Sequence, residues 1–453
     1  MSGVRFAPSP TGRLHIGNGR AALLNALYAR QHGVPFLLRI DDTDTEHTQP
    51  AFVEAIKGDL TWLGLSWDNL VFQSARQERY QRAADQLRAA GRLYPCYETP
   101  EELELQRKIA RSQGHPPIYD RAALALSPEQ KQQREAEGRR PYWRFLLKEQ
   151  RVSWIDNVYG VKSFEGIYAS DPVLVRADGL PVYTLASVVD DWELGITHVI
   201  RGADHLTNTA VQIQILEALE KGSAAAISWT HYPLFRTRSG EELSKRTGSL
   251  SLQELREEGT HPLALCSFLA KIGTSDPLVP ATSLEALVES FSLSKISLAE
   301  AQFDLSELRH LNRHLLHALP FSQVASDFQE KGIPLTPAFW EAIRENITTL
   351  KEGQQWWNIC YGKIPLPPDP DPDFREACLL CVQRAPEAIE TSEVWDALVL
   401  DLVQTTGRKG RALFQPLRLL LTGQETGPEL RLLASILGKA RMIQRLAYDD
   451  AAL

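Results

Sequence analysis

The stretch Pro8-Ser9-Pro10-Thr11-Gly12-Arg13-Leu14-His15-Ile16-Gly17-Asn18 decides the fold. It lies between an apolar run at residues 4–7, which predicts a short strand, and apolar residues at helical spacing, which predict a helix over 16–32 that ends at Gly33. A loop between a strand and a helix lies at the carboxyl edge of a parallel sheet, where open α/β folds bind ligands. Because the start of a helix also offers free backbone N–H groups to an anion, the stretch predicts a nucleotide site.

Strand and helix patterns continue outward from this stretch. Residues 35–40 form a second apolar run, and residues 49–63 and 76–90 carry apolar residues at helical spacing. This order predicts a parallel sheet with helices on its faces, which is an α/β fold. Residues 100–140 are polar and highly charged and predict an insertion of helices and loops. From residue 306 onward helical periodicity dominates.

The charge of the chain is unevenly distributed. Its 453 residues have a net charge of −8, which excludes a uniformly basic nucleic-acid coat. Residues 366–400 carry eight acidic side chains against two basic ones, whereas residues 402–446 carry eight basic against two acidic. The basic segment is therefore either a contact for a phosphate backbone or an ordinary solvated face.

The cysteines and the hydropathy pattern point to a compartment. Five scattered cysteines are typical of thiols in a reducing environment rather than of a disulfide framework. No apolar run approaches the roughly 18 residues that a membrane span needs, and the N-terminus does not resemble a signal peptide. These observations predict a cytoplasmic protein without a membrane partner.

A second chemical element is Leu243-Ser244-Lys245-Arg246, which follows a polar segment with a glycine. Adjacent Lys and Arg in a mobile loop suit a triphosphate whose charge moves during a reaction. Such a triplet is also common in solvated loops, so by itself it decides little.

Together, His15-Ile16-Gly17-Asn18 and Leu243-Ser244-Lys245-Arg246 resemble the two signature motifs of class I aminoacyl-tRNA synthetases. Further segments are similar to the glutamate/glutamine branch of that class: Phe6-Ala7-Pro8-Ser9-Pro10-Thr11-Gly12, Leu38-Arg39-Ile40-Asp41-Asp42-Thr43-Asp44, Val188-Val189-Asp190-Asp191 and Val199-Ile200-Arg201-Gly202. The helical C-terminal half, with Lys409-Gly410-Arg411, Pro416-Leu417-Arg418 and Leu421-Thr422-Gly423, resembles the bacterial glutamyl-tRNA synthetases and not the glutaminyl enzymes, whose anticodon domains are β-barrels.

The resemblance implies an α/β fold with a Rossmann-like class I catalytic domain, an inserted domain and a mainly helical anticodon-binding region. The implied parts are a catalytic domain in two halves (1–95 and 173–225), an inserted domain that binds the tRNA acceptor (96–172), a stem-contact region that carries the Ser-Lys-Arg loop (226–305) and helical anticodon-binding modules (306–365 and 373–453). The proline-rich segment Pro365–Pro372 predicts a linker between these modules.

The resemblance also implies a reaction and its residues. L-glutamate is activated with ATP to glutamyl-adenylate, and the acyl group passes to the terminal adenosine of tRNA(Glu). His15 and Lys245 would be catalytic by stabilising the triphosphate, and Gly17 would make room for the adenine. The implied ATP site is completed by Asn18, Ser244 and Arg246. Mg²⁺ would accompany ATP, bound mainly through the phosphates.

Glutamate recognition needs a cation for a carboxylate and an anion for the ammonium group. The residues that match family positions for it are Arg5, Ser9, Asp41, Tyr183, Ser187 and Arg201. Two of them depart from the family pattern, since Asp41 stands where many relatives have Glu and Ser187 where Asn is common. From the residues alone, other interpretations are open: Arg5 could pair with Asp41 or Asp44, and Tyr183 could belong to the core.

Other expectations concern partners and metals. The residues that we expect to contact tRNA are Arg344, Arg408, Lys409, Arg411 and Arg418. We expect no zinc, because Cys96 and His115 lack the paired ligands that the inserted domain of some relatives carries. We expect a monomer. The motifs do not decide whether tRNA(Gln) is a second substrate, and the alternative function is an inactive paralogue that binds tRNA.

Overall fold

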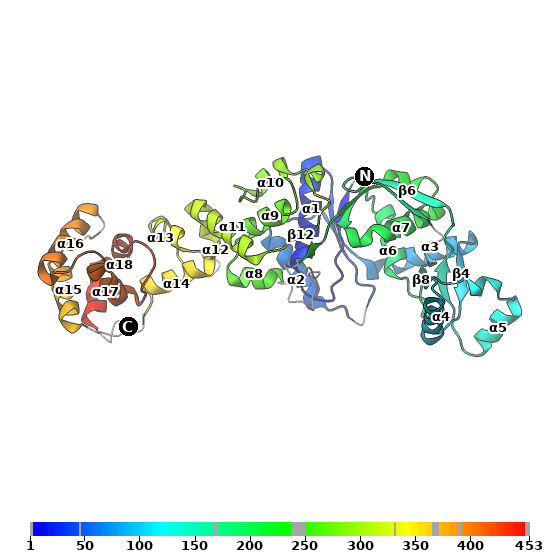
Figure 1. Ribbon diagram of the computed structural model, residues 1–453, viewed down its shortest axis with the longest axis horizontal. Coiled ribbons are helices and arrows are strands. Elements are labelled where there is room, and N and C mark those ends of the chain that lie inside the picture. The colour runs from blue at the N-terminus through cyan, green and yellow to red at the C-terminus, as the bar shows by residue number, and fades with distance from the viewer. Residues whose placement is uncertain are drawn as a thin grey trace. The chain divides into compact units, whose positions relative to one another are not determined.

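A computed structural model describes residues 3–44, 47–165, 170–236, 251–329, 332–364, 371–387, 389 and 391–448. The chain divides into two compact units, and Figure 1 shows their elements along the chain. Unit 1 comprises Met1–Glu254 and Cys266–Asp304, and unit 2 comprises Leu255–Leu265 and Leu305–Leu453. None of the helices in the described ranges has the length and apolar character needed to cross a bilayer.

Unit 1 is built on a parallel sheet. The strands β1 (Val4–Phe6), β2 (Phe36–Ile40) and β3 (Asn69–Phe72) pair in this order, and α1 (Ile16–His32) and α2 (Pro50–Trp62) connect them. All five residues of β2 are buried, as expected for a strand covered on both faces. The strand and helix patterns of the first hundred residues are thereby confirmed.

A second parallel pair lies on the other side of β1. A parallel bridge joins Gly3 to Ile196, just before β9 (His198–Gly202), and β9 pairs in parallel with β10 (Ser228–Tyr232). Later strands therefore lie on both sides of β1, with β2 on one side and β9 on the other. The space between the carboxyl ends of β1 and β9 is the topological switch point, where open α/β folds bind ligands.

The inserted region contributes both helices and strands. The helices α4 (Pro100–Ser112) and α5 (Pro128–Ala136) confirm the prediction for residues 100–140, and each begins with a capping box. Two strand groups flank them. β4 (Leu93–Cys96), β5 (Tyr142–Phe145) and β8 (Val173–Val175) form an antiparallel sheet, and β6 (Arg151–Asp156) forms a hairpin with β7 (Gly160–Glu165). β6 also pairs in parallel with β10, so the hairpin extends the sheet in the order β7-β6-β10-β9.

The remaining elements of unit 1 cover the sheets or complete their edges. They are α3 (Gln77–Ala89), α6 (Tyr183–Glu193), α7 (Leu206–Leu219), α10 (Leu284–Ser290) and the pair β11 (Phe235–Arg236) and β12 (Ala301–Gln302). The chain passes between the units within α8 (Leu252–Glu258) and α9 (Pro262–Lys271).

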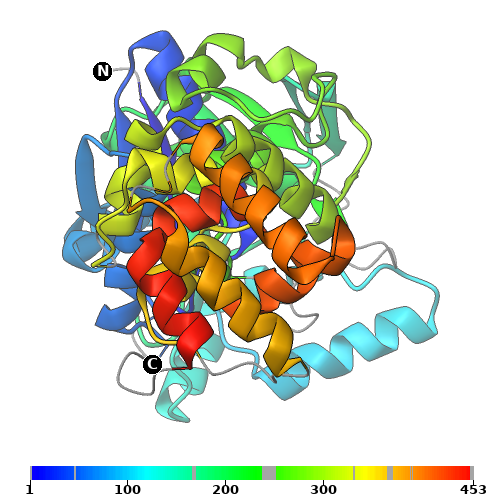
Figure 2. The ribbon, with the colours of Figure 1, turned by 90° about the vertical axis from the view of Figure 1, so that its left-hand side faces the viewer.

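All regular elements in the described part of unit 2 are helices joined by short connections, which confirms the predicted helical C-terminal half. Its helices are α11 (Leu305–Ala318), α12 (Phe321–Gln329), α13 (Pro337–Ile343), α14 (Leu350–Tyr361), α15 (Pro372–Arg384), α16 (Ser392–Thr406), α17 (Arg411–Thr422) and α18 (Leu430–Ala447). Figure 2 shows α15 to α18, in orange to red, against one another, and their apolar residues share one core.

The predicted linker Pro365–Pro372 needs one correction. Residues 365–370 lie outside the described residues, but Pro372 is the first residue of α15 rather than part of the linker. Asp371 is the N-cap, and its carboxylate accepts the backbone N–H of Phe374 at 3.0 Å. Proline suits the first helical position because that residue donates no hydrogen bond within the helix.

Candidate active site

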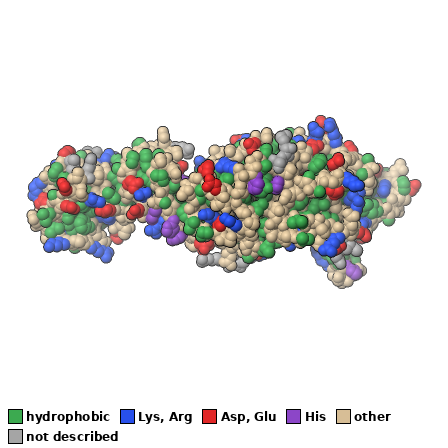
Figure 3. Space-filling model, turned by 90° about the horizontal axis from the view of Figure 1, so that it is seen from above, with side chains coloured by type: hydrophobic (Ala, Val, Ile, Leu, Met, Phe, Trp, Pro, Cys, Tyr) green, Lys and Arg blue, Asp and Glu red, His purple; other side chains and the backbone are tan. Residues whose placement is uncertain are grey.

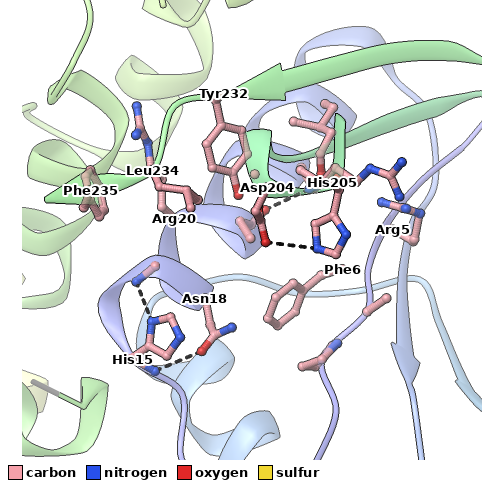
Figure 4. Close-up of a pocket in the computed structure, with 18 of the residues that line it drawn as sticks. Arg5, Phe6, His15, Asn18, Arg20, Asp204, His205, Tyr232, Leu234 and Phe235 are labelled. Atoms are coloured by element: carbon pink, nitrogen blue, oxygen red, sulfur yellow. Dashed lines mark hydrogen bonds and ion pairs between the residues drawn. The ribbon is translucent and has the colours of Figure 1, made fainter. Parts of the chain in front are cut away.

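A cavity of about 280 Å³ lies at the switch point of unit 1. It is lined by the end of β1, the start of α1, the end of β9 and the loop after β10 (Figure 4). Figure 4 shows His15 and Asn18 at one end of it, and Arg5 with His205 at the other. The lining residues are Arg5, Phe6, Ala7, Pro8, His15, Gly17, Asn18, Arg20, Ala21, Asn25, Tyr183, Ile200, Arg201, Gly202, Asp204, His205, Tyr232, Pro233, Leu234 and Phe235.

The first end of the cavity is the capped start of α1. His15 is the N-cap, and its Nδ1 accepts the backbone N–H of Gly17 at 3.0 Å, while the Asn18 side chain accepts the backbone N–H of His15 at 3.2 Å. These two bonds fix the imidazole at the positive end of the helix, beside the cavity. The arrangement suits an anionic group of a ligand.

Glycine at position 17 is explained by His15. A Cβ there would be 2.8 Å from His15 Cε1 and 3.0 Å from Nδ1, closer than such atoms approach. The glycine therefore makes room for the imidazole of the same motif. The predicted role of Gly17 in making room for an adenine ring stays a prediction.

The opposite end of the cavity is cationic and rests on a buried charge network. Arg5 Nε donates to Asp191 Oδ1 at 3.0 Å, and Arg39 donates to the same oxygen at 2.9 Å and to both oxygens of Asp41 at 2.6 and 3.1 Å. Burial opposes the ionisation of Asp191, but Arg5 and Arg39 outweigh it and lower its pKa below the ordinary value. The interpretation that Arg5 pairs with Asp41 is therefore wrong, since its partner is Asp191 of α6.

Two more predicted residues line this end. Tyr183, at the start of α6, is 37% exposed, so the interpretation that it belongs to the core is wrong. Arg201, on β9, is buried, and burial lowers its pKa to about 10. Beside them His205 lies 3.5 Å from Asp204, yet burial and Arg201 lower its pKa to about 4 and keep the imidazole neutral near pH 7.

The other predicted glutamate-site residues are not among the cavity-lining ones. Ser9 is exposed, whereas Asp41 and Ser187 are buried. Burial raises the pKa of Asp41 to about 6, although Arg39 opposes this shift. Ser187 accepts a hydrogen bond from Gln212, which in turn accepts one from Arg201 at 2.7 Å. The predicted Ser244, Lys245 and Arg246 lie outside the described residues.

Sequence reasoning missed Arg20 of α1, a buried cation that lines the cavity. It donates to the backbone oxygens of Pro233 at 3.2 Å and Ile272 at 2.9 Å, and its guanidinium lies over the rings of Tyr232 and Phe235. Burial lowers its pKa to about 10. The available signal was an arginine within the apolar stripe of a predicted helix. Arginine is rarely fully buried unless it has partners, so its position there indicated a special role.

The acidic pair of α6 was also missed as part of the site. Asp190 is fully buried and accepts hydrogen bonds from Gln73, Arg76 and Tyr80, while Asp191 holds Arg5. The signal was present, since Val188-Val189-Asp190-Asp191 places two acids in an apolar segment. Buried carboxylates of this kind require partners, which here are the arginines of three other elements.

The candidate tRNA-binding residues of unit 2 differ in exposure. Lys409 and Arg411 are exposed at the start of α17. Arg408 pairs with Asp371 and lies over the ring of Phe374, and Arg418 donates to the backbone oxygen of Pro428 at 2.7 Å. The sequence count of basic residues therefore overstates the charge that a partner would meet. On the face drawn in Figure 3, Lys and Arg are interspersed with Asp and Glu.

Arg344 is the remaining candidate. It pairs with Glu341 at 2.8 Å and is the first residue after α13.

Cys96, one of the residues considered for zinc, has another partner. Cys96 is buried in β4 beside Tyr119, whose hydroxyl donates to Glu98 at 2.8 Å. In the part of the chain that the structure describes, no three His, Cys, Asp or Glu side chains gather as metal ligands would. The expectation of no zinc stays a prediction.

Known proteins match both the fold and the motifs. Residues 3–310 match the family of class I tRNA synthetases (E and Q), catalytic domain, and residues 317–449 match an anticodon binding domain. Glutamate–tRNA ligase 2 of Dinoroseobacter shibae is 48% identical over 95% of this chain and 97% of its own. Glutamate–tRNA ligase 2 of Methylobacterium radiotolerans and the glutamate–tRNA ligase of Azospirillum brasilense are each 49% identical over 99% of both chains.

Solved structures agree. The crystal structure of a glutamate tRNA ligase from Elizabethkingia meningosepticum, in complex with its amino acid, is 27% identical and covers 98% of each chain with a TM-score of 0.80. These matches extend over the α/β unit, the switch-point motifs and the helical half alike. The chain therefore belongs to the class I tRNA synthetases of the glutamate and glutamine branch, within the glutamate–tRNA ligase family.

Proposed function

We propose that the protein is a glutamate–tRNA ligase that activates L-glutamate with ATP and transfers it to tRNA(Glu). One observation carries the proposal: a single cavity has the His15-capped start of α1 at one end and the cations Arg5 and Arg201 at the other. A nucleotide phosphate and an amino-acid carboxylate would thus meet inside one site, as adenylate formation requires.

The two steps use little covalent chemistry from the protein. A carboxylate oxygen of glutamate attacks the α-phosphorus of ATP, and the bond to the bridging oxygen breaks and releases pyrophosphate. A ribose hydroxyl of the terminal adenosine of tRNA then attacks the acyl carbon, and AMP leaves. The residues contribute position and charge, which stabilise the transition state without any protein-bound intermediate.

At the nucleotide end, we propose that His15 and Lys245 stabilise the charge that develops on the triphosphate. Gly17 and Asn18 shape this end of the cavity, and Ser244 and Arg246 would join it from the second motif. Mg²⁺, which favours phosphate and water oxygens, would enter with the nucleotide and neutralise part of its charge.

At the amino-acid end, we propose that Arg5 and Arg201 bind carboxylate oxygens and that Tyr183 closes the pocket. Arg5 is anchored by one nitrogen on Asp191, and the planar guanidinium has further N–H groups for a ligand. Asp41 would bind the ammonium group and Ser9 would help to hold the amino acid, while Ser187 would act through Gln212, its hydrogen-bond partner.

We propose that residues 96–172 approach the tRNA acceptor, residues 226–305 its stem, and residues 306–365 and 373–453 its anticodon. The proposed tRNA contacts are Arg344, Arg408, Lys409, Arg411 and Arg418. Lys409 and Arg411 are exposed, whereas Arg408 and Arg418 are half-buried. We expect a monomer that acts in the cytoplasm.

Two assays test the proposal. ATP–pyrophosphate exchange with glutamate is expected to occur and to require tRNA, and charging of purified tRNA(Glu) and tRNA(Gln), side by side, identifies the substrate. Tight tRNA binding without exchange or charging would instead identify an inactive paralogue that binds tRNA.

A further inference from the structure

Three adjacent strands of unit 1 place Asp156, His231 and Arg201 in a row. Arg201 of β9 is the register partner of His231 on β10, and Asp156 of β6 is the register partner of Trp229, two residues before His231. Side chains two residues apart on a strand point to the same face, so the three can meet in line. All three side chains are buried.

The contacts of Arg201 are unusual for a buried cation. Its Nε donates to His231 Nε2 at 3.2 Å, and its Nη2 donates to Thr209 Oγ1 and to Gln212 Oε1, each at 2.7 Å. These acceptors are all uncharged. Nη1 is buried and has no hydrogen-bond partner among the residues that the structure describes. A buried guanidinium whose acceptors are uncharged, and which has one nitrogen without a hydrogen-bond partner, is suited to bind an anionic ligand.

The proton position on His231 follows from its neighbours. Its Nδ1 lies 2.6 Å from Asp156 Oδ2. Because an ionised carboxylate only accepts hydrogen bonds, Nδ1 must carry the proton. Nε2 is then an acceptor, which is what the N–H of Arg201 requires. The opposite tautomer would set two donors against each other.

Asp156 is itself held rigidly. Its Oδ1 accepts the backbone N–H groups of Val158 at 3.0 Å and Tyr159 at 2.9 Å, in the turn of the β6–β7 hairpin. These bonds and His231 outweigh burial and lower the pKa of Asp156, which therefore stays ionised. The hairpin turn thus holds the carboxylate of Asp156, and this carboxylate sets the tautomer of His231. His231 Nε2 can then accept the hydrogen bond that orients Arg201.

We propose that Asp156 and His231 are positioning residues that orient Arg201 and hold its Nη1 ready for a carboxylate of the amino-acid substrate. The inference rests on the proposed function, in which Arg201 binds glutamate. A neutral imidazole supports the guanidinium without cancelling its charge, whereas an acidic side chain at position 231 would compete with the substrate carboxylate.

The test measures tRNA charging while glutamate, ATP and tRNA are varied in turn. Asp156→Asn is expected to raise the KM for glutamate about tenfold, because the amide can donate to Nδ1 and favour the wrong tautomer. The KM values for ATP and tRNA are expected to stay within about twofold, and kcat within about threefold. A selective change in one KM is not what general loosening of the fold would produce.

Two variants of His231 supply a rescue comparison. His231→Leu fills similar space without hydrogen bonds and is expected to raise the KM for glutamate at least as much as Asp156→Asn. His231→Gln can donate through its amide nitrogen and accept through its oxygen, so we expect it to recover most of the affinity. If Asp156→Asn does not melt cooperatively, the difference between these two variants decides.

Asn157→Ala is the matched control. Asn157 follows Asp156 and donates to Ser228 Oγ at 2.9 Å and Thr230 Oγ1 at 2.8 Å, so it ties the same strands without contacting His231. We expect its glutamate KM to stay within about twofold of the parent's. Equal changes in Asn157→Ala and Asp156→Asn would overturn the proposal, as would equal increases for glutamate and ATP or no increase at all.

Arg201→Gln separates this inference from the proposed function. If it leaves the KM for glutamate unchanged, the assignment of Arg201 to the substrate is wrong. If it raises that KM while Asp156→Asn and His231→Leu do not, Arg201 binds the substrate and only the positioning role is wrong.

Discussion

The imidazole of His15 lies so close to Gly17 that a Cβ at position 17 would be 2.8 Å from its Cε1. The two residues are also joined by the hydrogen bond from the Gly17 N–H to His15 Nδ1 at 3.0 Å. The glycine and the histidine of the motif are therefore one structural device. The absence of a side chain at one position lets the other cap the helix and lie beside the cavity.

Gly17→Ala is expected to lower the rate of adenylate formation about tenfold to a hundredfold, because the new methyl group displaces the imidazole from its place. Stability should change little. Loss of the cap costs about 1 kcal/mol, and alanine in place of glycine in a helix returns about the same. The measurements are single-turnover adenylation and thermal melting.

Gly58→Ala is the control for this prediction. Gly58 lies on the exposed side of α2, and a Cβ there would meet no atom within 4 Å. We expect full activity and a small gain in stability. If Gly17→Ala is as active as Gly58→Ala, His15 does not act on the nucleotide.

The raised pKa of Asp41 predicts that the KM for glutamate depends on pH. Burial raises its pKa from 3.8 to about 6, so the carboxylate takes up a proton as the pH falls below about 6. If its charge attracts the ammonium group of glutamate, the KM for glutamate rises below that pH, by up to about tenfold per pH unit. Asp41→Asn should have a high KM at pH 7.5 with no such rise. A KM that is flat from pH 7.5 to 5 in the parent would contradict the role.

Lys409 and Arg411 are expected to contact phosphates. Reversing both charges to Glu should weaken tRNA binding and reduce the slope of log affinity against log salt by about 1 to 2. The single reversal Arg411→Glu has a matched control in Arg384→Glu of α15, which changes the net charge equally at an arginine that already pairs with Asp401 at 2.9 Å. An unchanged slope would mean that Lys409 and Arg411 belong to a solvated face and do not contact tRNA. Arg408→Glu differs, because the loss of its pair with Asp371 should lower the melting temperature.

Lys245→Ala is expected to slow adenylate formation by about a hundredfold or more, with tRNA affinity within twofold, because the charge of Lys245 would act mainly in the transition state. Lys57→Ala, which removes a lysine paired with Glu54 at 2.7 Å on α2, serves as the control. Equal losses of rate and of tRNA affinity would count against a transition-state role for Lys245.

The sequence was most informative where the signal is local. Helix α1 has the predicted bounds because its apolar spacing is uninterrupted and Gly33, with φ of 63°, ends it in the left-handed conformation. The switch-point cavity was also predictable, since a loop between the first strand and the first helix must lie at the carboxyl edge of the sheet.

Partners that are distant in sequence were not predictable. Arg5 and Asp191 are separated by 186 positions, whereas the candidate partners offered by the sequence, Asp41 and Asp44, are much nearer along the chain. Tyr183 resembles a core residue because it begins an apolar segment, yet its position at the start of α6 leaves it exposed. Such assignments depend on which strands become neighbours, and no local pattern records that.

The pairing of β6 with β10 has a consequence for chimeric enzymes. A swap of residues 96–172 between relatives would exchange β6 and β7 together with the inserted helices. The pairing of β6 with β10 would then join strands from two different proteins. The transplantable piece is shorter than it looks in the sequence. Residues 151–165 belong with the recipient, because exchanging only the helical part between β4 and β5 leaves the pairing of β6 with β10 unchanged.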